Sequence, residues 1–229
     1  MRKKKLRLLV TKYCERDCAG CCNKDIDLDA LPVAQSYKGY KEISISGGEP
    51  LSDMYSLENV IKKIKRVNKS AKIYVYTSRS EEFDQFRYLM QLKISGITLT
   101  VHNKSDKLNF YKLNTKLADD FRPFREASLR LIVLKGVNID PDIFGNGIWH
   151  LKNNVEWQEK CPLPEGEELM RVDWAVEDRQ RDPESEEFQE IREDSEFSSE
   201  DGMRRMFRQA VSFRPSSSDS LTESSDVPF

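Results

Sequence analysis

The segment LRLLVTKYCERDCAGCCNKD, residues 6–25, joins a short aliphatic run to a polar loop that holds four of the chain's five cysteines. Its first five residues have the length and the aliphatic composition of a β-strand. The start of the chain lacks the apolar core and the cleavage pattern of an export signal, so the thiols are expected to stay reduced. Clustered cysteines in a reducing compartment are typical of metal ligands or redox groups.

Four later segments repeat this order of a strand followed by a polar or turn-forming stretch. They are EISIS, KIYVYT, ITLTV and LRLIVL, at residues 42–46, 72–77, 97–101 and 129–134. Helices are predicted between them, from apolar faces at residues 57–67 and 83–90 and a weaker pattern at 107–121. Strands and helices that alternate in this way form βαβ units, which predicts a parallel sheet of the α/β class.

The polar turns are expected to meet at one edge of that sheet. SGGEPL follows the second strand, TSRS the third and HNKSD the fourth, while the cysteine loop follows the first. In parallel sheets the ligand sites lie at the carboxyl ends of the strands, in the loops that leave them. The sequence therefore predicts one site to which all four segments contribute.

The charge divides the chain into two segments. Residues 1–164 hold 29 Lys and Arg against 20 Asp and Glu, whereas residues 165–229 hold 8 against 19. The first segment is predicted to be the core domain, in which residues 148–164 add a last strand or a short helix. The second segment, acidic and Ser-rich, is predicted to be a mostly disordered tail with a short docking helix near residues 200–213.

The sequence has no run of the roughly 20 apolar residues that a membrane span requires. A soluble, cytoplasmic protein without a membrane partner is therefore expected. Nucleic acid is a disfavoured partner, since no recognition motif accompanies the lysines of the first segment. Solvated surface is the favoured interpretation of Arg130 and Lys135, and contact with the carboxylate of a bound ligand is the alternative; no role is assigned to His150.

Three of the cysteines, Cys14, Cys18 and Cys21, have the spacing C-x3-C-x2-C. Three thiolates on so short a loop can bind three corners of a [4Fe–4S] cluster and leave the fourth iron open for a substrate. The alternative is a zinc site, which would need four ligands and commonly uses two separated cysteine pairs. Cys22 and Cys161 are interpreted as structural thiols.

The turn after the second strand, ISGGEPL at residues 45–51, contains two glycines, which allow a ligand to approach the backbone closely. Taken alone it would be interpreted as an ordinary strand-to-helix turn. Together, CERDCAGC and SGGEP resemble the two hallmark motifs of the radical S-adenosylmethionine (radical SAM) enzymes, over residues 5 to about 160.

This resemblance implies a cofactor pair and an activity. It implies a metal site made of Cys14, Cys18 and Cys21. It implies a turn that contacts the methionine end of S-adenosylmethionine, made of Gly47, Gly48, Glu49 and Pro50. In the family, an electron from the reduced [4Fe–4S] cluster cleaves S-adenosylmethionine to a 5′-deoxyadenosyl radical, which abstracts hydrogen from a substrate. The protein would thus be an oxidoreductase-type enzyme that receives electrons from a flavodoxin or a ferredoxin.

Further cofactor contacts are implied at the ends of the other strands. Thr77 and Ser78 end the third strand, where the family often has a polar turn near the cofactor. His102 and Asn103 end the fourth strand, where family members contact the ribose or the methionine carboxylate. Capping of the next helix is the alternative role for these last two residues.

The sequence departs from the family at two points. Gly20 stands where the family commonly has an aromatic residue beside the adenine, so Tyr13 is the candidate for that stacking contact. The complete family barrel has six strands, and five are predicted here. We therefore expect a partial (β/α) barrel that is open on one side, which suits a large substrate such as another protein.

Three functional alternatives follow within and beyond the family. The small size is similar to that of the activating enzymes that install a glycyl radical, especially the anaerobic ribonucleotide reductase activator. A compact synthase similar to the 7-carboxy-7-deazaguanine synthases is the second candidate, although those carry Asp-Thr where this chain has Cys22 and Asn23. The third is a non-catalytic iron–sulfur binding module whose tail recruits a partner.

Overall fold

The computed structural model describes residues 4–16, 18, 20–141, 148–156, 163 and 165–174, without the side chain of Cys22. All of them belong to one compact unit, residues 1–177. The predicted docking helix near residues 200–213, most of the predicted tail and Cys161 lie outside the described residues.

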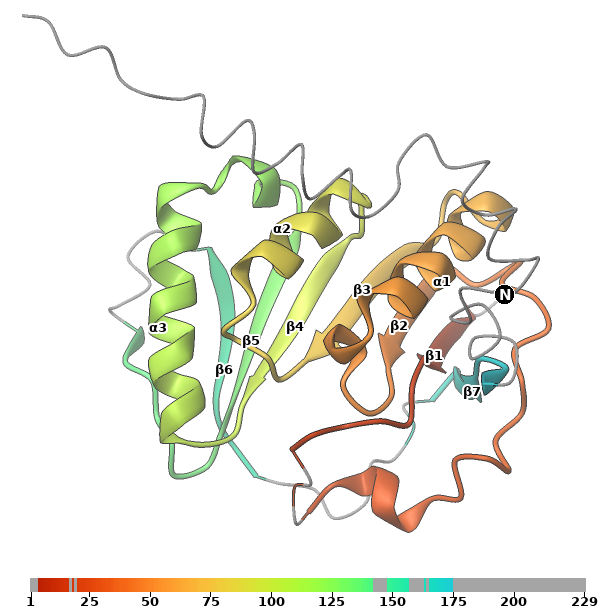
Figure 1. Cartoon of the computed structure of the whole chain (residues 1–229), viewed down its shortest axis with the longest axis horizontal. Coiled ribbons are helices and arrows are strands. Elements are labelled where there is room, and N and C mark those ends of the chain that lie inside the picture. Colours follow the sequence, from red (N-terminus) through yellow and green to blue (C-terminus); the bar gives the residue numbers. More distant parts are fainter. Residues whose placement is uncertain are drawn as a thin grey trace, which may run out of the picture. The chain divides into compact units, whose positions relative to one another are not determined.

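The core of the protein is one sheet of seven parallel strands (Figure 1). Five of them confirm the predicted strands to within one residue at either end: β1 (Lys5–Leu9), β2 (Glu42–Ser46), β3 (Lys72–Thr77), β4 (Gly96–Val101) and β5 (Ser128–Leu134). The other two are β6 (Trp149–Val155), one of the two outcomes predicted for residues 148–164, and β7 (Glu167–Arg171). The α/β class and the parallel pairing predicted from the sequence are thus confirmed.

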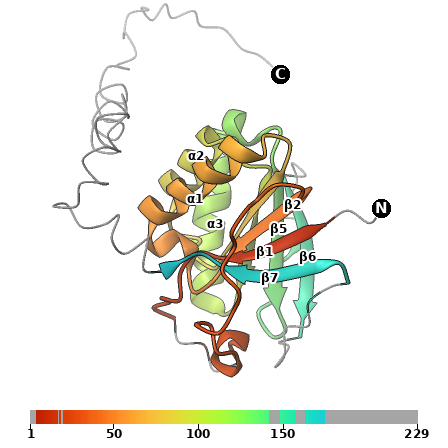
Figure 2. The same cartoon turned by 90° about the vertical axis from the view of Figure 1, so that its right-hand side faces the viewer.

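Three α-helices cover one face of the sheet, as the turned view in Figure 2 shows. They are α1 (Met54–Val67), α2 (Phe83–Gln91) and α3 (Lys104–Asp119). Side-chain caps fix the starts of two of them, because the Asp53 carboxylate accepts from the Ser56 N–H and the Asn103 side chain accepts from the Asp106 N–H. Their apolar faces pack on the sheet, with buried residues that include Leu57, Ile61, Phe86, Leu89, Phe110 and Leu117.

The strand order explains why these helices share a face. From one edge the order is β6-β5-β4-β3-β2-β1-β7, so β1 to β6 follow one another across the sheet as they do along the chain. Successive crossovers of the same hand that always step in one direction place every helix on the same side. The opposite face is covered by no described α-helix, and we call it the helix-free face.

The seventh strand corrects the predicted domain boundary. The sequence places residues 167–171 in the acidic tail, whereas in the structure they form β7, which pairs in parallel with β1 from Lys5↔Glu167 onward. The acidic residues that suggested a tail have partners inside the sheet. Glu167 forms an ion pair with Arg7 at 3.0 Å, and Glu168 accepts a hydrogen bond from the Tyr40 hydroxyl.

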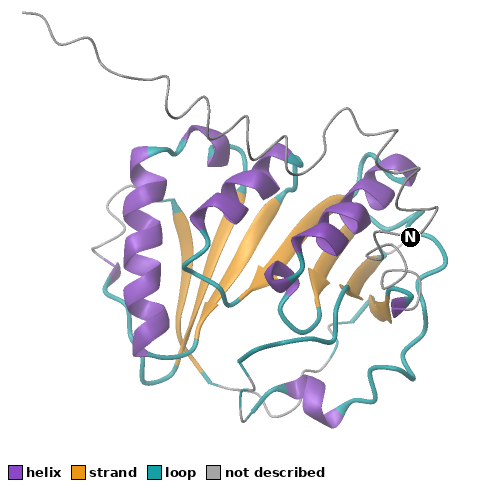
Figure 3. Ribbon diagram, viewed as in Figure 1, coloured by secondary structure: helices purple, strands orange, loops and turns teal. Residues whose placement is uncertain are grey.

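The connection from β1 to β2 differs from the later crossovers. It contains the cysteine loop and no α-helix among its described residues, only the short 3-10 helix η1 (Cys22–Asp25), as Figure 3 shows. Two further 3-10 helices, η2 (Pro50–Ser52) and η3 (Arg122–Phe124), precede α1 and β5. Among the described helices, none has both the length and the apolar character that crossing a bilayer requires.

Candidate functional site

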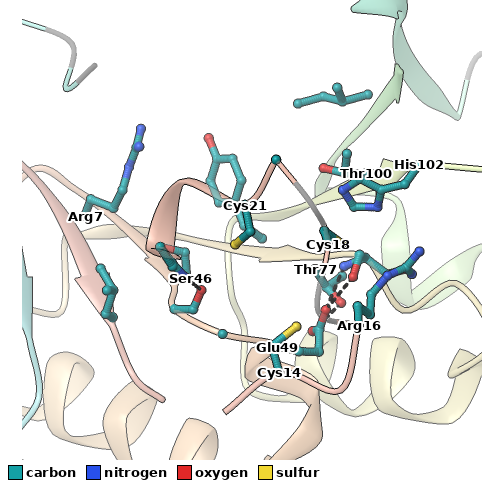
Figure 4. Close-up of a pocket in the computed structure, with 18 of the residues that line it drawn as sticks. Arg7, Cys14, Arg16, Cys18, Cys21, Ser46, Glu49, Thr77, Thr100 and His102 are labelled. Carbon is teal, nitrogen blue, oxygen red and sulfur yellow. Dashed lines mark hydrogen bonds between the residues drawn. The ribbon is translucent and has the colours of Figure 1, made fainter. Parts of the chain in front are cut away.

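A cavity of about 390 Å³ lies where the strands end and the polar loops begin. Its walls come from the cysteine loop, from the turn after β2, from the carboxyl halves of β3, β4 and β5, and from residues of β1 and β7 (Figure 4). The predicted convergence of the polar segments on one edge of the sheet is therefore observed.

The three cysteines of the loop line this cavity together. Cys14, Cys18 and Cys21 are each half-buried, and Figure 4 shows them around the same opening. Burial raises the pKa of the Cys14 thiol, and the charges of Glu49 and of the other two cysteines raise it further, against a hydrogen bond to the Arg16 backbone. Within the described part of the chain, no three His, Cys, Asp or Glu side chains converge closely enough to hold a single metal ion.

The glycine turn packs directly on the cysteine loop. The Gly48 N–H donates to the Thr11 carbonyl at 2.6 Å, and the Glu49 N–H donates to the Tyr13 carbonyl at 2.8 Å, which extends the pairing of β1 with β2 beyond both strands. A Cβ atom on Gly48 would lie 1.8 Å from the Tyr13 carbonyl oxygen, and one on Gly47 would lie 2.3 Å from that of Thr11. Both glycines are thus required by the contact between the two motifs.

The buried Glu49 carboxylate joins the turn to the end of β3. It is 3% exposed and accepts four hydrogen bonds. One oxygen accepts from the Leu51 N–H and, at 2.6 Å, from the Thr77 hydroxyl; the other accepts from the N–H and the hydroxyl of Ser78, both at 2.9 Å. All four donors are neutral, and no ion pair with Glu49 occurs among the described residues, so its negative charge stands uncompensated beside the cavity.

A second connection runs from the cysteine loop to α3 through Arg16. The guanidinium donates to the Ser78 carbonyl at 2.9 Å and to the Asp106 carboxylate at 2.5 Å, and it also lies against the Cys18 thiol. The same Asp106 oxygen accepts from the His102 N–H at 2.9 Å. Burial alone would raise the pKa of the Asp106 carboxyl, but the hydrogen bonds from His102 and Arg16 outweigh it and lower the pKa to about 2.

A third connection joins the two sequence motifs through a side-chain amide. Asn23, in η1 after the last ligand candidate, donates from Nδ2 to the Gly47 carbonyl at 2.6 Å. The loops that follow β1, β2, β3 and β4 therefore form one hydrogen-bonded assembly, which we call the rim network: Asn23, Glu49, Thr77, Ser78, Arg16, Asp106 and His102.

The cavity brings together most of the residues that the sequence analysis singled out. Those that line it are Cys14, Cys18, Cys21, Gly47, Gly48, Glu49, Thr77, Ser78 and His102. Three others do not line it. Pro50 begins η2, Asn103 caps α3 through its side chain, which is the alternative role considered for it, and the Tyr13 side chain is 59% exposed.

Sequence reasoning missed the residues that connect the loops. Arg16 lies between two cysteines and Asp106 within the polar segment after β4, but nothing in their spacing predicts that they pair across 90 positions. For Asn23, the only indication in the sequence is its place in the segment after the third cysteine. The long-range partners of these three side chains become visible only once the loops are placed in space.

Comparison with known proteins adds no family to this picture. No protein-family model matches the chain. A search of curated proteins likewise finds no significant match. The functional interpretation therefore rests on the two motifs and on the geometry that joins them.

Proposed function

We propose that the protein is a radical SAM enzyme, which uses a [4Fe–4S] cluster and S-adenosylmethionine to abstract hydrogen from a substrate. The observation that carries this proposal is the shared cavity: the three thiols of the C-x3-C-x2-C loop and residues 46–49 of the SGGEP turn line it together at the carboxyl ends of parallel strands. The contact between the motifs, through two backbone hydrogen bonds and the Asn23 side chain, supports a common role.

The donor set fits a cluster with an open corner. Cysteine thiolates are the usual ligands of iron–sulfur clusters, and in a cube each thiolate would bind a different iron, so the three sulfurs need not converge on one point. Without a cation the Cys14 thiolate is disfavoured by burial and by the neighbouring negative groups. A cluster would stabilise the deprotonated form, because its irons supply the missing positive charge.

The electrostatics of the cavity suit a cationic ligand. S-adenosylmethionine carries a sulfonium and an ammonium group, and the buried, uncompensated Glu49 carboxylate lines the wall beside which they would bind. The hydroxyls of Thr77 and Ser78 hold that carboxylate in place, so their role in cofactor binding would be indirect. When bound and reduced, the cluster supplies the electron that cleaves S-adenosylmethionine to methionine and a 5′-deoxyadenosyl radical.

The winding of the sheet supports a partial barrel. Strands β1 to β6 are adjacent in chain order with all described α-helices on one face, which is the arrangement of a (β/α) barrel and not of a doubly wound sheet. The edge strands β6 and β7 are not paired with each other, so the barrel would be open between them. A protein substrate, as in the glycyl-radical activating enzymes, and a small electron-transfer protein are the partners that this proposal includes.

Anaerobic reconstitution tests the proposal. The full-length protein is incubated with iron, sulfide and a thiol, reduced with dithionite and given S-adenosylmethionine. We expect a [4Fe–4S] absorption and electron paramagnetic resonance signal, followed by release of 5′-deoxyadenosine and methionine. Cys14→Ala should abolish both the cluster signal and the cleavage, whereas the matched variant Cys161→Ala, whose cysteine lies outside the loop, should retain both.

Two results would contradict the proposal. If the purified chain holds zinc and does not accept a cluster, the cysteine loop is a zinc site. If a cluster forms in the protein but the added S-adenosylmethionine yields neither 5′-deoxyadenosine nor methionine, the non-catalytic iron–sulfur module is the better interpretation.

A further inference from the structure

Alternate residues of the strands point to the helix-free face. On β4 and β5, Ile97, Leu99, Leu129 and Leu131 are buried in the core cluster that the helices cover, so Thr98 and Arg130 between them face the other way. The sheet register sets Tyr76, Thr98, Arg130 and His150 side by side in one row across β3, β4, β5 and β6. This row runs across the face that no described α-helix covers (Figure 2).

Arg130 is a charged group on this face without an acidic partner. Its guanidinium lies over the Tyr74 ring, 5.0 Å from the ring centre, and no described residue forms an ion pair or hydrogen bond with it. The strand carboxylates of the same face are already paired, Glu167 with Arg7 and Glu42 with Lys5. A guanidinium placed over an aromatic ring still has N–H donors available for a planar or tetrahedral anion.

Thr98, the neighbour of Arg130 in the row, has an unsatisfied hydroxyl. The residue is 1% exposed, and its Oγ1 has no hydrogen-bond partner in the described structure. An unpaired buried hydroxyl is costly, by about 1–3 kcal/mol, so such groups are usually satisfied by a ligand or a water. The hydroxyl is covered in this structure, so a ligand oxygen held between Arg130 and Thr98 would satisfy both after the covering side chains move aside.

The adjacent edge strand adds a histidine and a lysine to this face. His150 pairs in register with Arg130, and Lys152 with Ile132, so both side chains face the same way as Arg130. Both are exposed, and no described carboxylate pairs with either of them. An anion at Arg130 would therefore meet the positive charge of Lys152, and the carboxylate that follows β6, Glu156, is already paired with Lys135 at 2.7 Å.

We propose that Arg130, Thr98 and Lys152 form an anion-binding subsite that receives a carboxylate or phosphate group of the substrate. The link to a substrate rests on the proposed function, whereas the anion site itself does not. Thr100 and Ile132, which line the cavity, lie two residues beyond Thr98 and Arg130 on the same face. Tyr76, the member of the row next to Thr98, lines the cavity itself, so the subsite adjoins the cavity wall and lies within one strand repeat, about 7 Å, of Thr100 and Ile132. The substrate would carry its anionic group at about that distance from the part that enters the cavity.

The test is an anion titration of the full-length protein without a cluster. Inorganic phosphate or succinate is added at constant ionic strength, and the backbone amide signals of β4 and β5 are followed by nuclear magnetic resonance. We expect saturable shifts centred on Thr98 and Arg130. The anion that binds with the higher affinity indicates whether the substrate group is a phosphate or a carboxylate.

Variants identify the groups responsible. Arg130→Gln should weaken the binding at least about tenfold, because a charge-assisted hydrogen bond is lost, and Thr98→Val should weaken it about fivefold. Arg125→Gln is the matched control: Arg125 is also exposed but lies after η3, away from the row, and its substitution should leave the affinity unchanged. Shifts that do not saturate, or that persist in Arg130→Gln, would overturn the proposal.

The outcome is independent of the radical chemistry. A protein that binds the anion through Arg130 but never releases 5′-deoxyadenosine would refute the proposed function and retain the anion site. A protein that cleaves S-adenosylmethionine but shows no saturable anion binding would refute the subsite alone.

Discussion

The Asp106 carboxylate is held in its ionised form by its neighbours. Arg16 and His102 lower its pKa to about 2, below the value of about 3.9 for an unfolded chain. The side chain is 10% exposed in the ion pair with Arg16, so solvent screens it little. A carboxyl whose pKa is lower in the folded state than in the unfolded state stabilises the folded state at pH values above its unfolded pKa. This stabilisation is lost as the pH falls through its folded pKa.

We therefore predict that Asp106→Asn lowers the free energy of unfolding by about 2 kcal/mol at pH 7, and by roughly half of that at pH 3. Urea unfolding at the two pH values measures the difference. Asp120→Asn is the control, since its ion pair with Arg87 is well exposed and is expected to contribute less than about 0.5 kcal/mol at either pH. An equal loss for Asp106→Asn at both pH values would show that the ion pair is not its cause.

Gly48 is the second residue on which the site depends. In Gly48→Ala the new Cβ would meet a backbone carbonyl that cannot move without breaking the β1–β2 contact. We predict a loss of about 3 kcal/mol or more in unfolding free energy. Gly39→Ala, at a positive φ of 81° with nothing within 4 Å, should lose only about 1 kcal/mol. A similar melting temperature for the two variants would contradict the predicted clash.

The sequence predicts which residues lie at the site better than it predicts what each of their side chains contacts. The cysteine loop and the SGGEP turn are predicted to converge, and they do line one cavity, because each follows a strand of a parallel sheet. The sequence predicts a ligand surface at the two glycines, which stays a prediction, and the structure shows that they pack against the backbone of the cysteine loop. Contact of Glu49 with the methionine end of S-adenosylmethionine stays a prediction, whereas the structure shows its carboxylate accepting hydrogen bonds from Thr77 and Ser78. These are contacts between distant loops, which local patterns do not encode.

The four loops of the rim network behave as one element, because Glu49 and Arg16 connect them. Replacing the Glu49 carboxylate by an amide leaves at least one of its four donors without an acceptor. We predict that Glu49→Gln lowers the unfolding free energy by about 2 kcal/mol and speeds hydrogen exchange at the Ser78 amide, which donates to Glu49.

Glu81→Gln is the control for this variant. Glu81 lies in the same loop region, but its ion pair with Arg79 is exposed, so the substitution should change stability by less than about 0.5 kcal/mol. Unchanged exchange at Ser78 in Glu49→Gln would mean that the carboxylate does not hold the end of β3.

A strand is hardest to predict from the sequence when its charged side chains are paired with residues far away in the chain. β1 to β5 are aliphatic or β-branched because all five are covered on both edges and one face, and this pattern is sufficient to predict them. β7 begins with two glutamates, a composition typical of a tail, yet Arg7 and Tyr40 pair with those side chains. Local composition cannot distinguish a solvated carboxylate from one that meets a cation on a strand more than 150 residues away.

The placement of β7 makes a prediction about the whole molecule. A chain that ends at residue 164 lacks the strand that covers the outer edge of β1, whereas one that ends at residue 177 keeps the complete compact unit. We predict that residues 1–177 unfold cooperatively with a melting temperature close to that of the full chain. Residues 1–164 should melt much lower or bind a hydrophobic dye when native. Equal melting curves for the two truncations would refute a structural role for β7.

The same pairing of the first strand with the last has a consequence during translation. Because β7 is made after all the other strands, the outer edge of β1 stays open while the rest of the sheet is emerging from the ribosome. An uncovered strand edge can recruit other nascent chains, so this interval is when aggregation threatens the protein most. Chaperone dependence should accordingly end once the glutamates of β7 have reached Arg7 and Tyr40.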